Sequence, residues 1–88
     1  MSSEQHVSGN AIHVDQHESL PEVLERLRGH RGEPVTLEIA DHSPILLTAT
    51  EFRALKDHAD RQHIRLRVQT RDSLRLQLAS MFGLADPM

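Results

Sequence analysis

Residues 64–84, IRLRVQTRDSLRLQLASMFGL, contain a predicted strand, a polar corner and a predicted helix in direct succession. Apolar and polar residues alternate over residues 64–69, as in a strand with one buried face. In the second half, apolar residues recur at i, i+4, i+7 and i+8 and predict the buried stripe of a helix that Gly83 ends. These residues are Leu74, Leu78, Met81 and Phe82. The stretch favours an α/β fold, in which ligands usually bind at such strand-to-helix corners.

Two similar units precede this stretch. Residues 11–15, AIHVD, alternate as a short strand, and Ser19 and Glu22 then form a capping-box pattern at the start of a helix that ends at Gly29 to Gly32. Residues 34–40, PVTLEIA, predict a second strand. Thr48 or Thr50 can cap the next helix, which runs to about residue 63 and buries an apolar stripe. That stripe comprises Phe52, Leu55 and Ala59.

The predicted order is therefore β-α-β-α-β-α. Right-handed crossovers convert this order into a small, mostly parallel sheet of three strands. Strands of a parallel sheet that is covered on both faces are usually apolar throughout, whereas all three strands here alternate. We therefore expect one face of the sheet to be open or only partly covered. Its side chains are predicted to be His13, Thr36, Glu38, Arg65, Arg67 and Gln69.

Composition sets further limits. With 88 residues the chain is predicted to form one domain over residues 11–84, with a flexible tail at 1–10 and a short C-terminal tail at 85–88. It contains no cysteine, which excludes disulfides, thiolate metal sites and cysteine nucleophiles. No stretch reads as a signal peptide or a membrane span, so we expect a cytoplasmic protein without membrane insertion.

Charge is distributed unevenly along the chain. Residues 1–44 carry eight acidic and three basic residues, whereas residues 45–88 carry five acidic and seven basic residues. Five arginines concentrate the positive charge, namely Arg61, Arg65, Arg67, Arg71 and Arg75. Proteins that bind nucleic acid usually add aromatic stacking platforms or a strong net positive charge. The chain has a formal charge of −3 and no Trp or Tyr, so we expect no nucleic-acid partner.

Residues 11–29, 33–72 and 74–84 together resemble an uncharacterised bacterial α/β domain that is often found at the N-terminus of larger proteins. The resemblance lies in the hydrophobic pattern and in three spots: VD before a capped helix, SPILL after the second strand, and TRD followed by LR, LA and GL. It implies the β-α-β-α-β-α order and no known catalytic residues. The chain departs from that pattern at Ala40 and Asp41, where a proline is expected.

The order of elements and the final GL are also similar to those of STAS domains of the anti-sigma-factor antagonist type. That resemblance implies regulation by phosphorylation or nucleotide binding. The phosphorylated serine of those domains precedes the central helix, a place that Thr48 and Thr50 hold here without the expected Asp-Ser pair. Thr48 and Thr50 are therefore the phosphorylation candidates of this alternative.

Two further candidate sites also have simpler interpretations. In the TRDS corner, Thr70, Arg71 and Ser73 could hold an anion at the start of the last helix, but a cap formed by Asp72 or Ser73 explains the same residues. The second candidate is a set of two histidines and one aspartate at i, i+2 and i+4 of an extended segment, residue types that can bind zinc. It consists of His13, Asp15 and His17, and the bend expected before His17 weakens it.

No nucleophile–base arrangement can be recognised in the sequence. GxSxG is absent and Ser43-Pro44 has no histidine at a predictable distance, so we predict that the chain is not an enzyme and needs no cofactor. The sequence instead predicts a protein–protein interaction module that pairs with another chain through the open sheet face or through a free edge strand. Its partner-binding side chains would be Glu38, Arg65, Arg67 and Gln69, and its partner most simply a second copy of the chain, in a homodimer.

Overall fold

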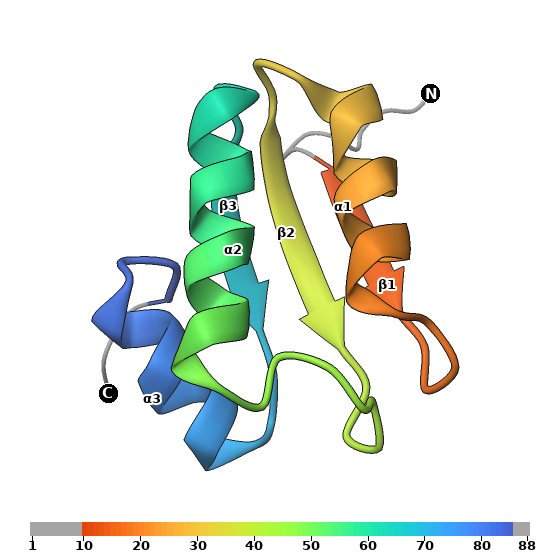
Figure 1. The fold of residues 1–88 in the computed structure, drawn as a ribbon, viewed down its shortest axis with the longest axis vertical. Helices are drawn as coiled ribbons and strands as arrows, with labels where there is room; N and C mark the ends of the chain where they lie inside the picture. The colour runs from red at the N-terminus through yellow and green to blue at the C-terminus, as the bar shows by residue number, and fades with distance from the viewer. Residues whose placement is uncertain (1–9, 86–88) are drawn as a thin grey trace, which may run out of the picture.

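The computed structural model describes residues 10–85 and shows a three-stranded parallel sheet with three α-helices (Figure 1). Strand order follows chain order, so that β2 lies between β1 and β3. The predicted α/β fold with β-α-β-α-β-α order is confirmed. The elements are β1 (Asn10–Val14), α1 (Leu20–Leu27), a 3₁₀ turn η1 (Arg28–His30), β2 (Pro34–Ile39), α2 (Ala49–Arg61), β3 (Arg65–Gln69) and α3 (Ser73–Met81).

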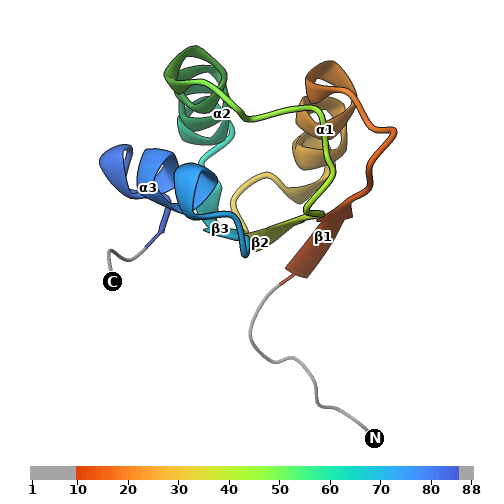
Figure 2. The ribbon, with the colours of Figure 1, turned by 90° about the horizontal axis from the view of Figure 1, so that it is seen from below.

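All three helices lie on the same face of the sheet (Figure 2). This follows from the topology, because two right-handed crossovers that step in the same direction across a sheet put both connecting helices on the same side. The helix after β3 stays in this layer, at the β3 edge. Within residues 10–85 the other face of the sheet has no helix over it, as the alternating strands predicted.

The core fills the space between the sheet and the helical layer. Every second strand residue points into it, and α1 and α2 each add an apolar stripe, so the predicted stripe of Phe52, Leu55 and Ala59 is confirmed. The sheet contributes Ile12, Val14, Val35, Leu37, Ile39, Leu66 and Val68. Aliphatic residues therefore make up nearly all of the core.

Local sequence signals explain where each helix begins. At α1 the Ser19 hydroxyl accepts the Glu22 N–H, and the Glu22 carboxylate accepts the Ser19 N–H at 2.7 Å, which completes the capping box. These hydrogen bonds from Ser19 favour the ionised carboxylate and lower the pKa of Glu22. Thr48, rather than Thr50, caps α2 by accepting the Glu51 N–H at 3.2 Å.

The predicted stripe of α3 was wrong in two of its four residues. Leu74 and Met81 are 49 % and 67 % exposed, whereas Arg75 and Ala79 are buried. The helix is rotated relative to the prediction because the Arg75 side chain occupies an interior position that apolar periodicity alone would assign to leucine. Gly83 does adopt the expected left-handed conformation, with a φ of 73°.

Element boundaries differ little from those predicted. β1 begins at Asn10, one residue before the expected domain start, and α2 ends at Arg61 rather than near His63. The predicted tails lie almost entirely in residues 1–9 and 86–88, which are outside the described residues.

Candidate functional site

The uncovered sheet face is the candidate site. Strand register places its side chains in rows that run across the sheet: His13, Glu38 and Gln69 form one row, and Ala11, Thr36 and Arg67 form the next. Arg65 lies beside Pro34 at the amino end of the sheet. Apart from Ala11 and Pro34 the face is polar, with basic side chains along β3 and one carboxylate on β2.

The four predicted partner-binding residues all lie on this face. Register places Glu38 opposite Gln69 and Arg67 opposite Thr36. Glu38 lies close to His13 on β1, with 3.9 Å between its Oε1 and the Nδ1 of His13. Arg65 is exposed and makes no side-chain hydrogen bond or ion pair within residues 10–85. Its charge therefore remains available to a partner.

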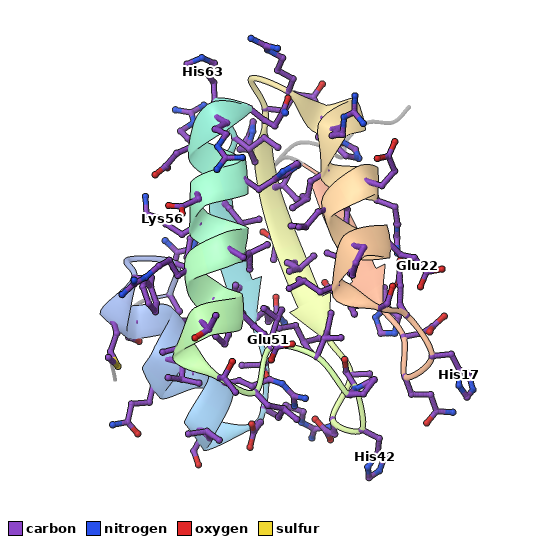
Figure 3. The ribbon with its side chains drawn as sticks, in the orientation of Figure 1. His17, Glu22, His42, Glu51, Lys56 and His63 are labelled. Carbon is purple, nitrogen blue, oxygen red and sulfur yellow. The ribbon has the colours of Figure 1, made fainter. Side chains whose placement is uncertain are left out.

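Two shallow hollows indent the carboxyl end of this face and share His13. One, of about 260 Å³, is lined by Glu38, Gln69, Thr70 and Arg71 beside His13 and Ile39. The other, of about 350 Å³, is lined by His13, Asp15, Gln16, Ala40, Asp41 and His42. In Figure 3, where β1 and β2 end, His17 and His42 extend outward from their loops. The carboxyl end therefore combines hydrogen-bond donors on the β3 side with carboxylates on the β1 side.

The TRDS corner is a helix start in the structure. Asp72 is the N-cap, and its Oδ2 accepts the Arg75 N–H at 3.2 Å. The Thr70 hydroxyl accepts the Asp72 N–H at 3.1 Å, while Arg71 and Ser73 are exposed. The simpler interpretation of the corner is thus confirmed for Asp72. Anion binding by Thr70, Arg71 and Ser73 stays a prediction.

We expect Asp72→Ala to lower the free energy of unfolding by about 1 to 2 kcal/mol, because the N-cap hydrogen bond is lost. The carboxylate also lies 3.6 Å from the buried Arg75 guanidinium, and its loss leaves that cation without a counter-ion. Urea unfolding of the parent and the variant measures the difference. Asp72→Asn is the control, since it keeps the cap but removes the charge, and an effect no larger for alanine than for asparagine would contradict the cap assignment.

The sequence did not predict a structural role for Arg75, which was grouped with the five arginines that concentrate the positive charge. It is 2 % exposed, and its Nε donates to the Ile45 carbonyl at 3.2 Å while Nη2 donates to the Ser43 carbonyl. The residue directly after Ile45 is Leu46, which is buried and has an unusual positive φ of 62°. The segments SPILL and TRD-x-LR, which carry the family resemblance, therefore contact each other through one guanidinium.

Burial of Arg75 also divides the predicted cluster of five arginines. Arg61 ends α2 in the helical layer, Arg65 and Arg67 lie on the uncovered face of β3, and Arg71 follows β3. The guanidinium of Arg75 points inside. The five side chains do not form one continuous basic surface.

The side chains of the predicted zinc site do not come together in the structure. Within residues 10–85 no three histidine or carboxylate side chains come together as a metal-ion site. Asp15 instead accepts the backbone N–H of His17 at 2.8 Å and so stabilises the turn that was expected to break the set. His13, Asp15 and His17 thus do not act as one ligand group here.

The two phosphorylation candidates differ in their surroundings. The Thr48 hydroxyl is engaged as the N-cap of α2, whereas Thr50 is exposed in the first turn. Phosphorylation of either residue stays a prediction.

Both outer edges of the sheet carry a contact. At β1, Nη1 of Arg26 donates to the His13 carbonyl at 3.0 Å and also contacts Glu18 at 2.6 Å. At β3, the Val68 N–H donates to the Leu84 carbonyl at 2.7 Å. Each edge strand therefore has one outward backbone group that is already hydrogen-bonded within the chain.

Comparison with known proteins gives no relative. The chain matches no protein-family model, no curated protein and no solved structure. Both family resemblances stay predictions. In the part of the chain that the structure describes, no helix has the length and apolar character needed to cross a membrane.

Proposed function

We propose that the chain is a non-catalytic protein–protein interaction module that binds its partner with the uncovered face of the sheet. The observation that carries this proposal is that α1 and α2 cover one face of a parallel sheet and α3 lies on the same side at the β3 edge, while no helix within residues 10–85 lies over the other face. Parallel sheets occur almost only with both faces covered, so an uncovered one is a natural surface for a second molecule.

Charge defines the kind of partner. Arg65 and Arg67 project from β3, while Glu38 and His13 lie across the two neighbouring strands. An acidic segment of a partner could pair with the arginines, and a basic side chain could pair with Glu38. Such complementary charges mainly determine specificity and association rate.

The area of the sheet face is too small for the strands alone to form a standard protein–protein interface. Three strands spaced by about 4.8 Å, each about 16 Å long, present a face of roughly 200 to 300 Å². A standard interface needs about 800 Å² from each partner. The binding surface would then continue onto the carboxyl-end loops, where Arg71 and His42 lie.

The hydrogen bonds that three serine and threonine hydroxyl groups make support a non-catalytic role. Ser19, Thr48 and Thr70 each accept a backbone N–H at a cap or a turn. A hydroxyl held in this way stabilises local structure rather than attacking a substrate.

The test is the double variant Arg65→Ala, Arg67→Ala. Exposed charges contribute little to folding, so we expect its free energy of unfolding to stay within about 1 kcal/mol of the parent. Partner binding should fall about tenfold or more, since two charges at one interface are lost. Immobilised parent and variant are exposed to an extract of the producing cells, and the retained proteins are quantified by mass spectrometry.

The matched control is Arg53→Ala, Arg61→Ala. It also removes two positive charges, but from exposed positions on α2 in the helical layer. A partner of the sheet face is retained by the parent and the control but lost by the Arg65, Arg67 variant. If both double variants retain the same proteins as the parent, the sheet face is not the binding surface.

A further inference from the structure

The outer edge of β3 has one residue whose backbone N–H and carbonyl both lack a partner within residues 10–85. In a strand, the N–H and carbonyl of one residue point to the same edge, and those of the next residue point to the other. The Arg65 N–H donates inward, to the Glu33 carbonyl at 3.1 Å. The Val68 N–H donates outward, to the Leu84 carbonyl at 2.7 Å. Both groups of Leu66 therefore point outward, where no hydrogen bond joins them to the described chain.

A hollow of about 520 Å³ lies beside this edge. It is larger than the two hollows at the carboxyl end of the uncovered face, and it has the volume of a site that encloses a bound group. Part of its lining is aliphatic and belongs to the core, namely Ala59, Ile64, Leu66 and Leu84. An apolar side chain placed here would contact the core directly.

The charges around this hollow are mainly positive. Three basic residues line it, Lys56, Arg65 and Arg67, together with one acid, Asp60. The carboxylate of Asp60 is bound to Lys56, with 2.9 Å between Oδ1 and Nζ. Lys56 extends from the side of α2 that faces away from α1 (Figure 3). The whole chain has a net charge of −3, so this edge is a locally basic region of an acidic protein and attracts an acidic segment.

We infer that the β3 edge binds a short extended segment of a partner protein in which one aliphatic residue lies between two acidic residues. The aliphatic residue lies opposite Leu66. In antiparallel pairing this single residue makes both hydrogen bonds to Leu66. Its side chain points into the hollow, because paired residues of neighbouring strands share a face. The two acidic neighbours point to the uncovered face, beside Arg65 and Arg67.

The Leu84 contact sets the length of the bound segment. Its carbonyl already occupies the Val68 N–H, so only about three residues centred on Leu66 can pair with β3. Two hydrogen bonds and one enclosed aliphatic side chain give weak binding. We expect an isolated peptide to bind with a Kd of about 0.1 to 1 mM.

The bound segment belongs to a different protein. Among the 13 acidic residues of this chain, no two are two positions apart, so a second copy cannot supply the segment. The inference rests on the proposed function and adds the kind of segment by which the partner is anchored. From the β3 edge the rest of the partner continues over the uncovered face.

NMR titration of the ¹⁵N-labelled full chain tests the inference. The probe is the capped peptide Ser-Thr-Glu-Val-Glu-Thr-Ser. Amide signals of residues 64–67 and 83–84 should shift while those of β1 do not, and the Leu66 signal should move downfield because its N–H gains an acceptor. The same peptide N-methylated at valine keeps its charges but loses the donor to the Leu66 carbonyl, and should bind about tenfold more weakly. The lysine analogue Ser-Thr-Lys-Val-Lys-Thr-Ser should not bind.

Arg65→Ala should weaken binding of the glutamate peptide about three- to fivefold, the effect of one exposed ion pair. Arg28→Ala is the matched control, since it removes one exposed charge next to α1, and should bind like the parent. Four results would each overturn the inference: no binding at up to about 5 mM peptide, equal binding of the N-methylated peptide, equal binding of the lysine analogue, or an Arg65→Ala protein that binds like the parent.

Failure here can be distinguished from failure of the proposed function. If the glutamate peptide does not bind, but the Arg65, Arg67 double variant loses a protein that the parent and the Arg53, Arg61 control retain, the inference about the β3 edge fails alone. If the peptide binds at the β3 edge while both double variants retain the same proteins as the parent, the uncovered face is not the binding surface and the proposed function fails.

Discussion

Arg75→Ala is expected to lower the free energy of unfolding by about 3 to 5 kcal/mol, a large part of the roughly 5 to 15 kcal/mol that a domain usually has. Its side chain is the largest fully buried one among the described residues. Truncation leaves a cavity and deprives the carbonyls of Ser43 and Ile45 of their donors. Unpaired buried carbonyls each cost about 1 to 3 kcal/mol.

Two variants separate packing from hydrogen bonding at this position. Arg75→Met keeps most of the volume without any donor, and Arg75→Lys keeps the charge, although its single ammonium cannot replace the guanidinium at both carbonyls. We expect both to lie between the parent and Arg75→Ala in urea unfolding. Amide hydrogen exchange of the variants should accelerate first in residues 41–47. An Arg75→Ala protein as stable as the parent would show that the guanidinium does not hold this loop.

Phe52→Ala should have a similar effect, about 3 to 5 kcal/mol, for a different reason. Phe52 is fully buried on α2 and is the largest apolar side chain in the core. Its removal leaves a cavity that short aliphatic neighbours cannot fill without moving α2. No polar group loses a partner, so the loss is one of packing alone.

Phe52→Leu is the matched control and should cost about 1 to 2 kcal/mol, since it retains most of the buried volume. Thermal unfolding followed by circular dichroism measures both variants. In contrast to Arg75→Ala, exchange should accelerate over the whole domain rather than first in the loop. Equal stability of the alanine and leucine variants would place Phe52 outside the critical core.

The fold was predictable because its signals are local. Strand alternation, the capping box at Ser19 and the glycine at position 83 each specify a short segment, and right-handed crossovers join the segments into one sheet. The uncovered face followed from the same alternation. Every residue predicted to line that face lies on it, since side chains of a strand must alternate once the register is set.

The position of Arg75 was not predictable in this way. Arginine is seldom buried, and the acceptors that make its burial possible come from a loop about 30 residues earlier. Apolar periodicity therefore assigned α3 the wrong face and hid the exposed stripe of Leu74 and Met81. A sequence signal did exist, in that Asp72 and Arg75 are spaced i, i+3 at a helix start, but the same spacing is common on surfaces.

The contacts at the two sheet edges have a consequence for behaviour in concentrated solution. An unprotected parallel edge can add strands from other molecules without limit and so begin fibrous aggregation. Here the Arg26 guanidinium binds the outward carbonyl of His13, and Leu84 binds the outward N–H of Val68. Each edge has lost one of the regularly spaced groups that an incoming strand would need. Addition of a strand along the whole of either edge would first have to break one of these hydrogen bonds, so both contacts oppose growth along the sheet.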